Sequence, residues 1–132
     1  MHFLRRLRLI RTHFIALLFL PITAFAQSAS TQLPDPLGAG WKGQATCEKL
    51  HEDAKVRILR CTFPPNVGHE RHFHAAHYVY VLSGGKLRTT SATGTTESEV
   101  KTGAGRMNAP IEWHEGLNVG ETTLSFLFVE PK

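Results

Sequence analysis

Hydrophobic and polar positions alternate along most of this chain in short runs, and glycines or prolines separate the runs. The clearest run is 122–130, where Leu124, Phe126 and Phe128 recur at every second position. This period is typical of a β-strand with one buried face. The same pattern, with Thr, Val, Ile and aromatic residues filling the runs, predicts further strands at 43–50, 55–63, 72–82, 86–91, 96–101, 105–109 and 112–117.

No segment of the chain shows a convincing 3.6-residue period, so we expect an all-β domain over 41–132. Seven or eight short strands in a segment of that length indicate a small sandwich or barrel. Residues 27–40 are small and polar and are interrupted by proline and glycine. This composition predicts a flexible leader in front of the domain.

The first 26 residues have the pattern of an export signal. Residues 1–13 are basic, residues 14–26 are apolar and uncharged, and Ala24-Phe25-Ala26 offers a small-x-small cleavage site. Thirteen apolar residues reach about 20 Å as a helix, which is short of the ~30 Å hydrocarbon core of a bilayer. We therefore predict a signal peptide at 1–26 and an exported, periplasmic mature protein, with an uncleaved anchor as the alternative. No second apolar stretch follows, so no membrane contact is expected after cleavage.

The basic charge of the chain comes from this same segment. Four of the 15 Lys and Arg residues lie within the first 26 positions, which contain no acidic residue. The remaining residues hold equal numbers of basic and acidic groups, 11 of each. A balanced charge argues against a nucleic-acid partner for the folded domain.

The two cysteines, Cys47 and Cys61, lie in runs that flank a turn at 51–54. If the chain forms a hairpin there, the two residues face each other across it. In an oxidising compartment such a pair forms a disulfide, although two free, half-buried thiols are the alternative.

Four histidines fall within nine residues: His69, His72, His74 and His77. On an extended strand His72 and His74 point to one face, where two imidazoles can share a metal ion. His77 has the opposite parity and needs a bend at Ala75-Ala76 to join them, and His69 is expected at an exposed rim. A further histidine, His114, lies far downstream. The spacing alone leaves open whether this is a metal site or a histidine-rich surface loop.

Two segments resemble the paired motifs of the cupin superfamily. Segment 64–85 is similar to the first motif, G-x5-H-x-H-x(3–4)-E-x6-G, with His72 and His74 as its histidines and Gly84 as its last glycine. Segment 103–118 is similar to the second motif, G-x5-P-x-G-x2-H-x3-N, through Pro110, His114 and Asn118, with one residue fewer between the proline and the histidine. The resemblance covers most of 41–130 and implies a double-stranded β-helix, a small jelly-roll-like barrel with a metal in its mouth.

The sequence departs from these motifs at several positions. Asn66 stands where the first glycine is expected, and Glu112 stands where the second motif has glycine. The position of the usual glutamate falls on His77 when the count starts from Gly84, and on Tyr78 when it starts from Gly85. We favour His77, because imidazole is the better ligand. The resemblance then implies an all-histidine metal site formed by His72, His74, His77 and His114.

Imidazole ligands suit a divalent transition metal, and Fe, Zn, Ni, Cu and Mn all remain open. Four neutral ligands leave a six-coordinate ion two open positions and its full positive charge. We therefore expect a metal-dependent enzyme, dioxygenase- or isomerase-type, acting on a small anionic or enolisable molecule. Glu70 has the parity of His72 and is the one candidate for a catalytic base or for an acceptor of an imidazole N–H.

Two other functions stay open: a non-catalytic periplasmic protein that binds metal or a small-molecule ligand, and a barrel in which metal only stabilises the fold. The resemblance also suggests a homodimer.

Overall fold

The computed structural model describes residues 32–132. The expected signal peptide at 1–26 lies outside the described residues. Within the described part no helix has the length and hydropathy to cross a membrane. The ordered elements are strands: β1 (Gly40–Trp41), β2 (Gln44–Ala45), β3 (Cys47–Glu52), β4 (Val56–Phe63), β5 (Gly68–His74), β6 (His77–Ser83), β7 (Gly85–Ser91), β8 (Gly94–Val100), β9 (Gly105–Asn108), β10 (Ile111–Asn118) and β11 (Leu124–Pro131).

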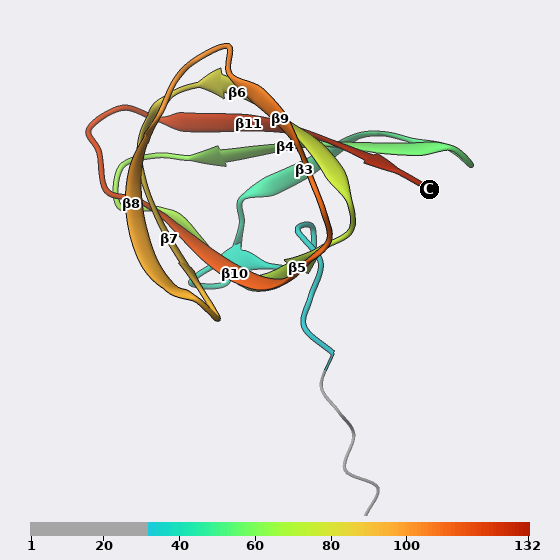
Figure 1. Ribbon diagram of the computed structural model, residues 1–132, viewed down its shortest axis with the longest axis horizontal. Helices are drawn as coiled ribbons and strands as arrows, with labels where there is room; N and C mark the ends of the chain where they lie inside the picture. The colour runs from blue at the N-terminus through green and yellow to red at the C-terminus, as the bar shows by residue number, and fades with distance from the viewer. Residues whose placement is uncertain (1–31) are drawn as a thin grey trace, which may run out of the picture. The chain divides into compact units, whose positions relative to one another are not determined.

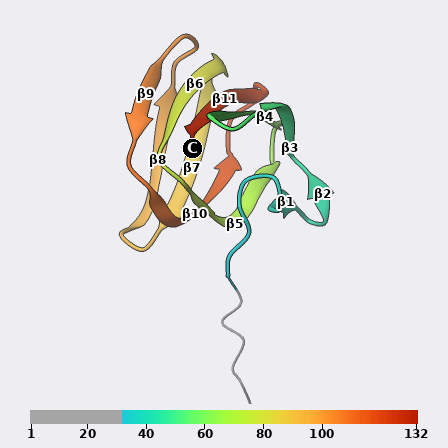
Figure 2. The same cartoon turned by 90° about the vertical axis from the view of Figure 1, so that its right-hand side faces the viewer.

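The strands form two main sheets that face each other (Figure 1). One sheet has five strands in the order β3-β4-β11-β6-β9, and the other has four in the order β5-β10-β7-β8. Neighbouring strands run antiparallel throughout both sheets. Figure 2 shows the small β1-β2 ribbon beside β5, on the side where the chain enters the barrel. The prediction of an all-β barrel is confirmed.

The alternation predicted for 122–130 is present in β11, where Leu124, Phe126 and Glu130 are buried. Its inner face joins Cys61, Phe63 and Val81 in one apolar cluster. Burial of such side chains contributes about 1.5–3 kcal/mol each relative to exposure. The core therefore lies on the inner face of the five-stranded sheet and forms one wall of the interior.

The predicted strand 72–82 is two strands, because the chain changes sheets at Ala75-Ala76. β5 pairs with β10 in the four-stranded sheet, whereas β6 pairs with β11 and β9 in the other. On one continuous strand, His74 and His77 would face opposite sides of the sheet. The two residues between β5 and β6 allow both side chains to face the interior. As a result both His74 and His77 are buried, whereas Tyr78 is 41% exposed.

The described part of the expected flexible leader, residues 32–40, packs against the barrel. The carbonyl oxygens of Pro34 and Pro36 accept hydrogen bonds from the Phe73 amide and the His69 ring, at 3.1 and 3.0 Å. Asp35 forms an ion pair with Arg57 of β4. Composition alone did not reveal these contacts, because the partners are distant residues of β4 and β5.

The expected hairpin and disulfide are both present. Cys47 lies opposite Cys61 in the β3–β4 register, and the two sulfurs are bonded. The turn is held by Asp53, whose carboxylate accepts hydrogen bonds from the amides of Lys55 and Val56. The disulfide thus joins two strands whose pairing is already local in sequence.

We predict that replacing Cys47 and Cys61 together by alanine lowers the free energy of unfolding by about 3 kcal/mol, the chain-entropy value for a loop of this size. Urea unfolding of the variant beside the oxidised wild type measures the difference. Alkylation of native, exported protein without reductant should label neither cysteine. Equal stability of the two proteins, or two labelled thiols, would contradict the prediction.

Candidate metal centre

Three histidine side chains converge in the interior, from both motifs singled out in the sequence. His72 and His74 come from β5, and His114 comes from the neighbouring strand β10. Their potential ligand atoms all lie within 4.8 Å of one another. The Nε2 atom of His72 lies 2.9 Å from that of His74 and 3.1 Å from that of His114. The fold therefore brings together three of the four residues expected as ligands.

Two irregularities in the β5–β10 pairing make this convergence possible. Between the pairs Ile111↔His74 and His114↔His72, β10 has one residue more than β5. This bulge places His114 directly opposite His72. Between His114↔His72 and Gly116↔His69, the extra residue lies on β5 instead. The second bulge reverses parity, so His69 turns inward as well.

His69 is 3% exposed, which contradicts the expected position at an exposed rim. Its Nε2 atom lies 3.0 Å from the Pro36 carbonyl oxygen and 3.7 Å from Cys47 Sγ. Because Cys47 is in a disulfide, the cluster of Cys47, Cys61 and His69 offers no thiolate to a metal. His69 instead packs beside His72, with ring centroids 3.8 Å apart.

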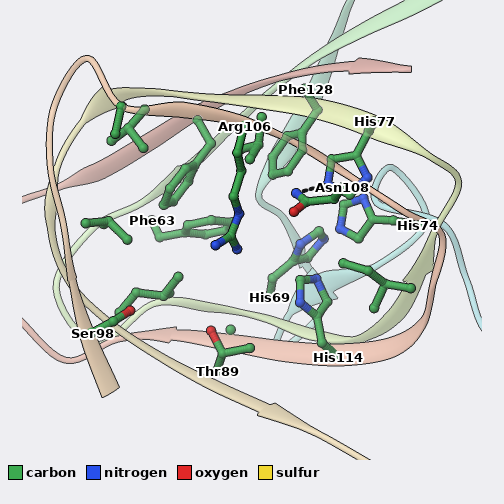
Figure 3. A pocket seen from close by; sticks show the side chains of 18 of the residues that line it. Phe63, His69, His74, His77, Thr89, Ser98, Arg106, Asn108, His114 and Phe128 are labelled. Atoms are coloured by element: carbon green, nitrogen blue, oxygen red, sulfur yellow. Dashed lines mark hydrogen bonds between the residues drawn. The ribbon is translucent and has the colours of Figure 1, made fainter. Parts of the chain in front are cut away.

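His77 lies next to this trio, but both of its ring nitrogens have hydrogen-bond partners. Nδ1 lies 2.8 Å from the Ala75 carbonyl oxygen and therefore donates to it. Nε2 then accepts from the side-chain amide of Asn108, at 3.0 Å (Figure 3). His77 thus faces the interior, as the sequence analysis favoured, while its Nε2 lone pair accepts a hydrogen bond from Asn108 rather than facing the other histidines.

Burial lowers the pKa of each histidine in the trio, because desolvation disfavours the charged ring. Repulsion from the neighbouring imidazoles adds to this effect at His74 and His114, and the pKa of His114 falls to about 3. The pKa of His69 falls to about 4 for the same reasons. The rings are consequently neutral at physiological pH, and each has a lone pair available for a metal.

A carboxylate behind His74 was not identified from the sequence. Glu130 Oε1 lies 3.9 Å from His74 Nδ1, and neither buried atom has a hydrogen-bond partner among the described residues. The other oxygen of Glu130 accepts from Arg57, which also pairs with Asp35. The sequence pattern could have identified this carboxylate. Glu130 follows Leu124, Phe126 and Phe128 at the same two-residue spacing, which places it on the inward face of the strand.

Glu70, the acceptor expected from the sequence, lies elsewhere. Its side chain is exposed, and its carboxylate accepts from the Lys42 amide at 2.8 Å. Only its backbone oxygen contacts the site, where it accepts from His72 Nδ1 at 2.6 Å. The bulge at Glu70-Arg71 explains the difference, because a bulge turns successive side chains away from their expected faces.

The donor set fits a divalent transition metal. Because His72 donates through Nδ1, its Nε2 has a lone pair facing the other two rings. Two nitrogens that bind one ion at about 2.1 Å and at a right angle lie about 3 Å apart, close to the separations present here. With metal on Nε2, the His74 proton resides on Nδ1, directed at the unpartnered oxygen of Glu130. Metal binding would therefore leave His74 with a donor that faces the Glu130 carboxylate, 3.9 Å away.

The histidines line a cavity of about 620 Å³ between the two sheets. Its wall is apolar on the side of the five-stranded sheet, where Phe63 and Phe128 project inward (Figure 3). Phe126 lines the same wall. The opposite side carries hydroxyl groups from β7 and β8, including Thr89 and Ser98. A small molecule in this cavity would reach the histidines and contact both polar and apolar groups.

Asn118, the other residue aligned with the second motif, has a structural role. It is fully buried, and its side-chain amide donates to the carbonyl oxygens of Phe63 and Thr122, each at 2.7 Å. Its side-chain oxygen accepts from the Gly120 amide. Asn118 therefore closes the turn between β10 and β11 and does not contribute to the histidine trio.

Comparison with solved structures identifies the fold. A cupin domain from Bordetella pertussis Tohama I matches with a TM-score of 0.61 at 22% identity, covering 65% of this chain and 91% of that one. The polyketide cyclase RemF from Streptomyces resistomycificus matches with a TM-score of 0.53 at 24% identity, covering 64% of this chain and 63% of RemF. A cupin-like protein from Thermotoga maritima MSB8 matches with a TM-score of 0.52 at 17% identity, covering 64% of this chain and 65% of that chain.

These likenesses show that the described residues have the cupin fold, a double-stranded β-helix. No protein-family model matches the sequence, and the search of curated proteins gives no match.

We predict that Glu130→Gln weakens metal affinity by about 10–100-fold, since an uncharged amide orients and polarises the His74 ring less well. The matched control is Glu70→Gln, which removes the same charge from an exposed side chain and should leave affinity unchanged. Competition with a chelator during zinc titration measures both variants, and thermal unfolding verifies that each is folded. Equal weakening by the two changes would contradict the assignment of Glu130.

Proposed function

We propose that this protein is a metal-dependent cupin enzyme acting on a small anionic or enolisable molecule, in a dioxygenase- or isomerase-type reaction. The observation that carries the proposal is the convergence of three neutral imidazoles, each with its Nε2 near the others, at the wall of a cavity. In this proposal His72, His74 and His114 hold a divalent transition metal, and His77 is the candidate for a fourth ligand.

A bound divalent metal would supply a Lewis acid that polarises an oxygen of the substrate. The chain's own residues prepare the site for this chemistry. The Glu70 carbonyl fixes the His72 tautomer, and Glu130 faces Nδ1 of His74. The aromatic wall formed by Phe63, Phe126 and Phe128 limits water access to the substrate's apolar side and strengthens polar interactions there.

A second candidate function is a non-catalytic periplasmic protein that binds metal or a small ligand. The position of Glu70 favours it, because the one acid–base candidate from the sequence has its carboxylate on the Lys42 amide. The polyketide cyclase among the structural neighbours is compatible with the enzymatic alternative. Turnover, measured directly, distinguishes the two functions.

Export and self-association belong to the same proposal. The pattern of residues 1–26 and the Cys47–Cys61 disulfide both favour a protein that works in the periplasm. The outer face of β6 and β9 carries exposed Tyr78, Tyr80, Leu82 and Met107, which would suit contact with a second copy in a homodimer.

We predict that His72→Ala combined with His74→Ala abolishes stoichiometric metal binding while the barrel stays folded. Two of the three converging ligands are lost, whereas the apolar cluster around Phe63, Val81 and Phe126 remains. Elemental analysis of the purified protein measures metal, and circular dichroism measures folding. One metal ion per chain in the folded double variant would contradict the site assignment.

The same preparations separate the two functions. Oxygen uptake or product formation with small diketones, thiols and hydroxy acids, dependent on bound metal and absent from the double variant, supports the enzyme. Full metal content without turnover on any of these classes supports the binding protein.

Two single variants test whether His77 or Tyr78 contributes to metal binding. We expect His77→Ala to weaken metal binding by about tenfold, as for loss of a ligand or of its close support. Tyr78→Phe should leave metal content unchanged, because Tyr78 lies on the outer face of β6. Both are measured by the zinc competition described above. Loss of metal in Tyr78→Phe but not in His77→Ala would reverse the motif alignment.

A further inference from the structure

An arginine side chain projects into the cavity from β9. This strand belongs to the five-stranded sheet, which faces the sheet that carries the histidine trio. In the β6–β9 register Arg106 lies opposite Val79 and Asn108 lies opposite His77, and all four line the cavity. The alternate residue Met107 faces outward and is 60% exposed. Figure 3 shows the Arg106 side chain extending into the middle of the cavity, between Phe63 and the histidines.

Arg106 differs from every other arginine of the described residues, because it has no protein partner among them. Of the four others, three form ion pairs with carboxylates and one stacks on an aromatic ring: Arg57 with Asp35 and Glu130, Arg60 with Glu48, Arg88 with Glu97, and Arg71 on Trp113 at 3.5 Å. Glu99 and Lys101 also line the cavity, but no ion pair joins Arg106 to Glu99. The guanidinium is therefore available to an anion from solution.

The groups around Arg106 define what kind of anion would fit. The aromatic side chains of Phe63 and Phe128 line one side of the cavity, and the hydroxyl-bearing Thr89 and Ser98 line the other. The planar fork of Arg matches a carboxylate through two parallel hydrogen bonds.

We infer that Arg106 is the anion-binding residue of the cavity, and that the ligand is a small carboxylate with an apolar body. The carboxylate pairs with the guanidinium, and the apolar body lies along the aromatic wall toward the histidines. In the proposed enzyme, this carboxylate is the class of substrate. Only the placement of the ligand's apolar body beside the histidines rests on the proposed function.

The test compares two probes of equal shape, 3-phenylpropionate and its neutral amide, by calorimetric titration of metal-free and zinc-loaded protein. A charge-assisted, bidentate pair should make the carboxylate bind the wild type at least about tenfold tighter than the amide. Arg106→Gln should remove this preference, and Arg106→Lys should retain part of it. The matched control, Arg88→Gln, removes one positive charge from the outer face of β7 and should keep the full preference.

Metal content, measured for each variant, separates this inference from the proposed function. Arg106→Gln should keep full metal content, because Arg106 contacts none of the trio. The double variant His72→Ala, His74→Ala should lose metal and keep the carboxylate preference. Failure of zinc to bind would overturn the metal centre alone. A wild type that binds acid and amide equally, or not at all at millimolar concentration, would overturn the inference, as would an Arg106→Gln protein that still prefers the carboxylate.

Discussion

The arrangement of this protein depends on the burial of several imidazole rings within one small interior. Protonated rings at these separations would repel one another and would lose the solvation that a charged group requires. Burial therefore lowers the pKa of His69, His72, His74 and His114. Each imidazole N–H in the interior also needs a hydrogen-bond partner. Backbone carbonyls supply this for His72 and His77, from Glu70 and Ala75, two residues before each ring. Such short-range contacts fix the tautomers and leave the Nε2 atoms of His72 and His77 as acceptors.

The strand geometry provides the second condition. A regular β-strand presents every second side chain to one face, so four histidines at positions 69, 72, 74 and 77 cannot all face inward on one such strand. Three departures from regular pairing solve this. The bulge at Glu70-Arg71 turns His69 inward, the bulge on β10 aligns His114 with His72, and the change of sheet at Ala75-Ala76 turns His77 inward. Each departure lies next to the histidine that it turns inward or aligns.

A series of ion pairs links the segment before the first strand to this interior. Asp35, from the segment that precedes the first strand, pairs with Arg57 of β4, and Arg57 pairs with Glu130 near the end of β11. Glu130 in turn faces His74. Packing of residues 34–39 thus contributes to the site indirectly, by holding the carboxylate that faces His74. Arg106 is not part of this series of ion pairs.

The sequence by itself determined the features that depend on neighbouring residues. The two-residue period of 122–130 predicted β11, the local turn at 51–54 predicted the Cys47–Cys61 pair, and His72-x-His74 predicted two rings on one face. The tertiary structure decided the features that depend on register between distant strands. The inward turn of His69 requires a bulge opposite β10, which no local pattern specifies. Glu130 replaces Glu70 as the carboxylate beside an imidazole because β11 lies next to β6 and β4, and its partner Arg57 is 73 residues away in sequence. Residues 32–40 have the composition of a flexible segment, yet they pack because β4 and β5 supply hydrogen-bond and ion-pair partners that become neighbours only when the barrel closes.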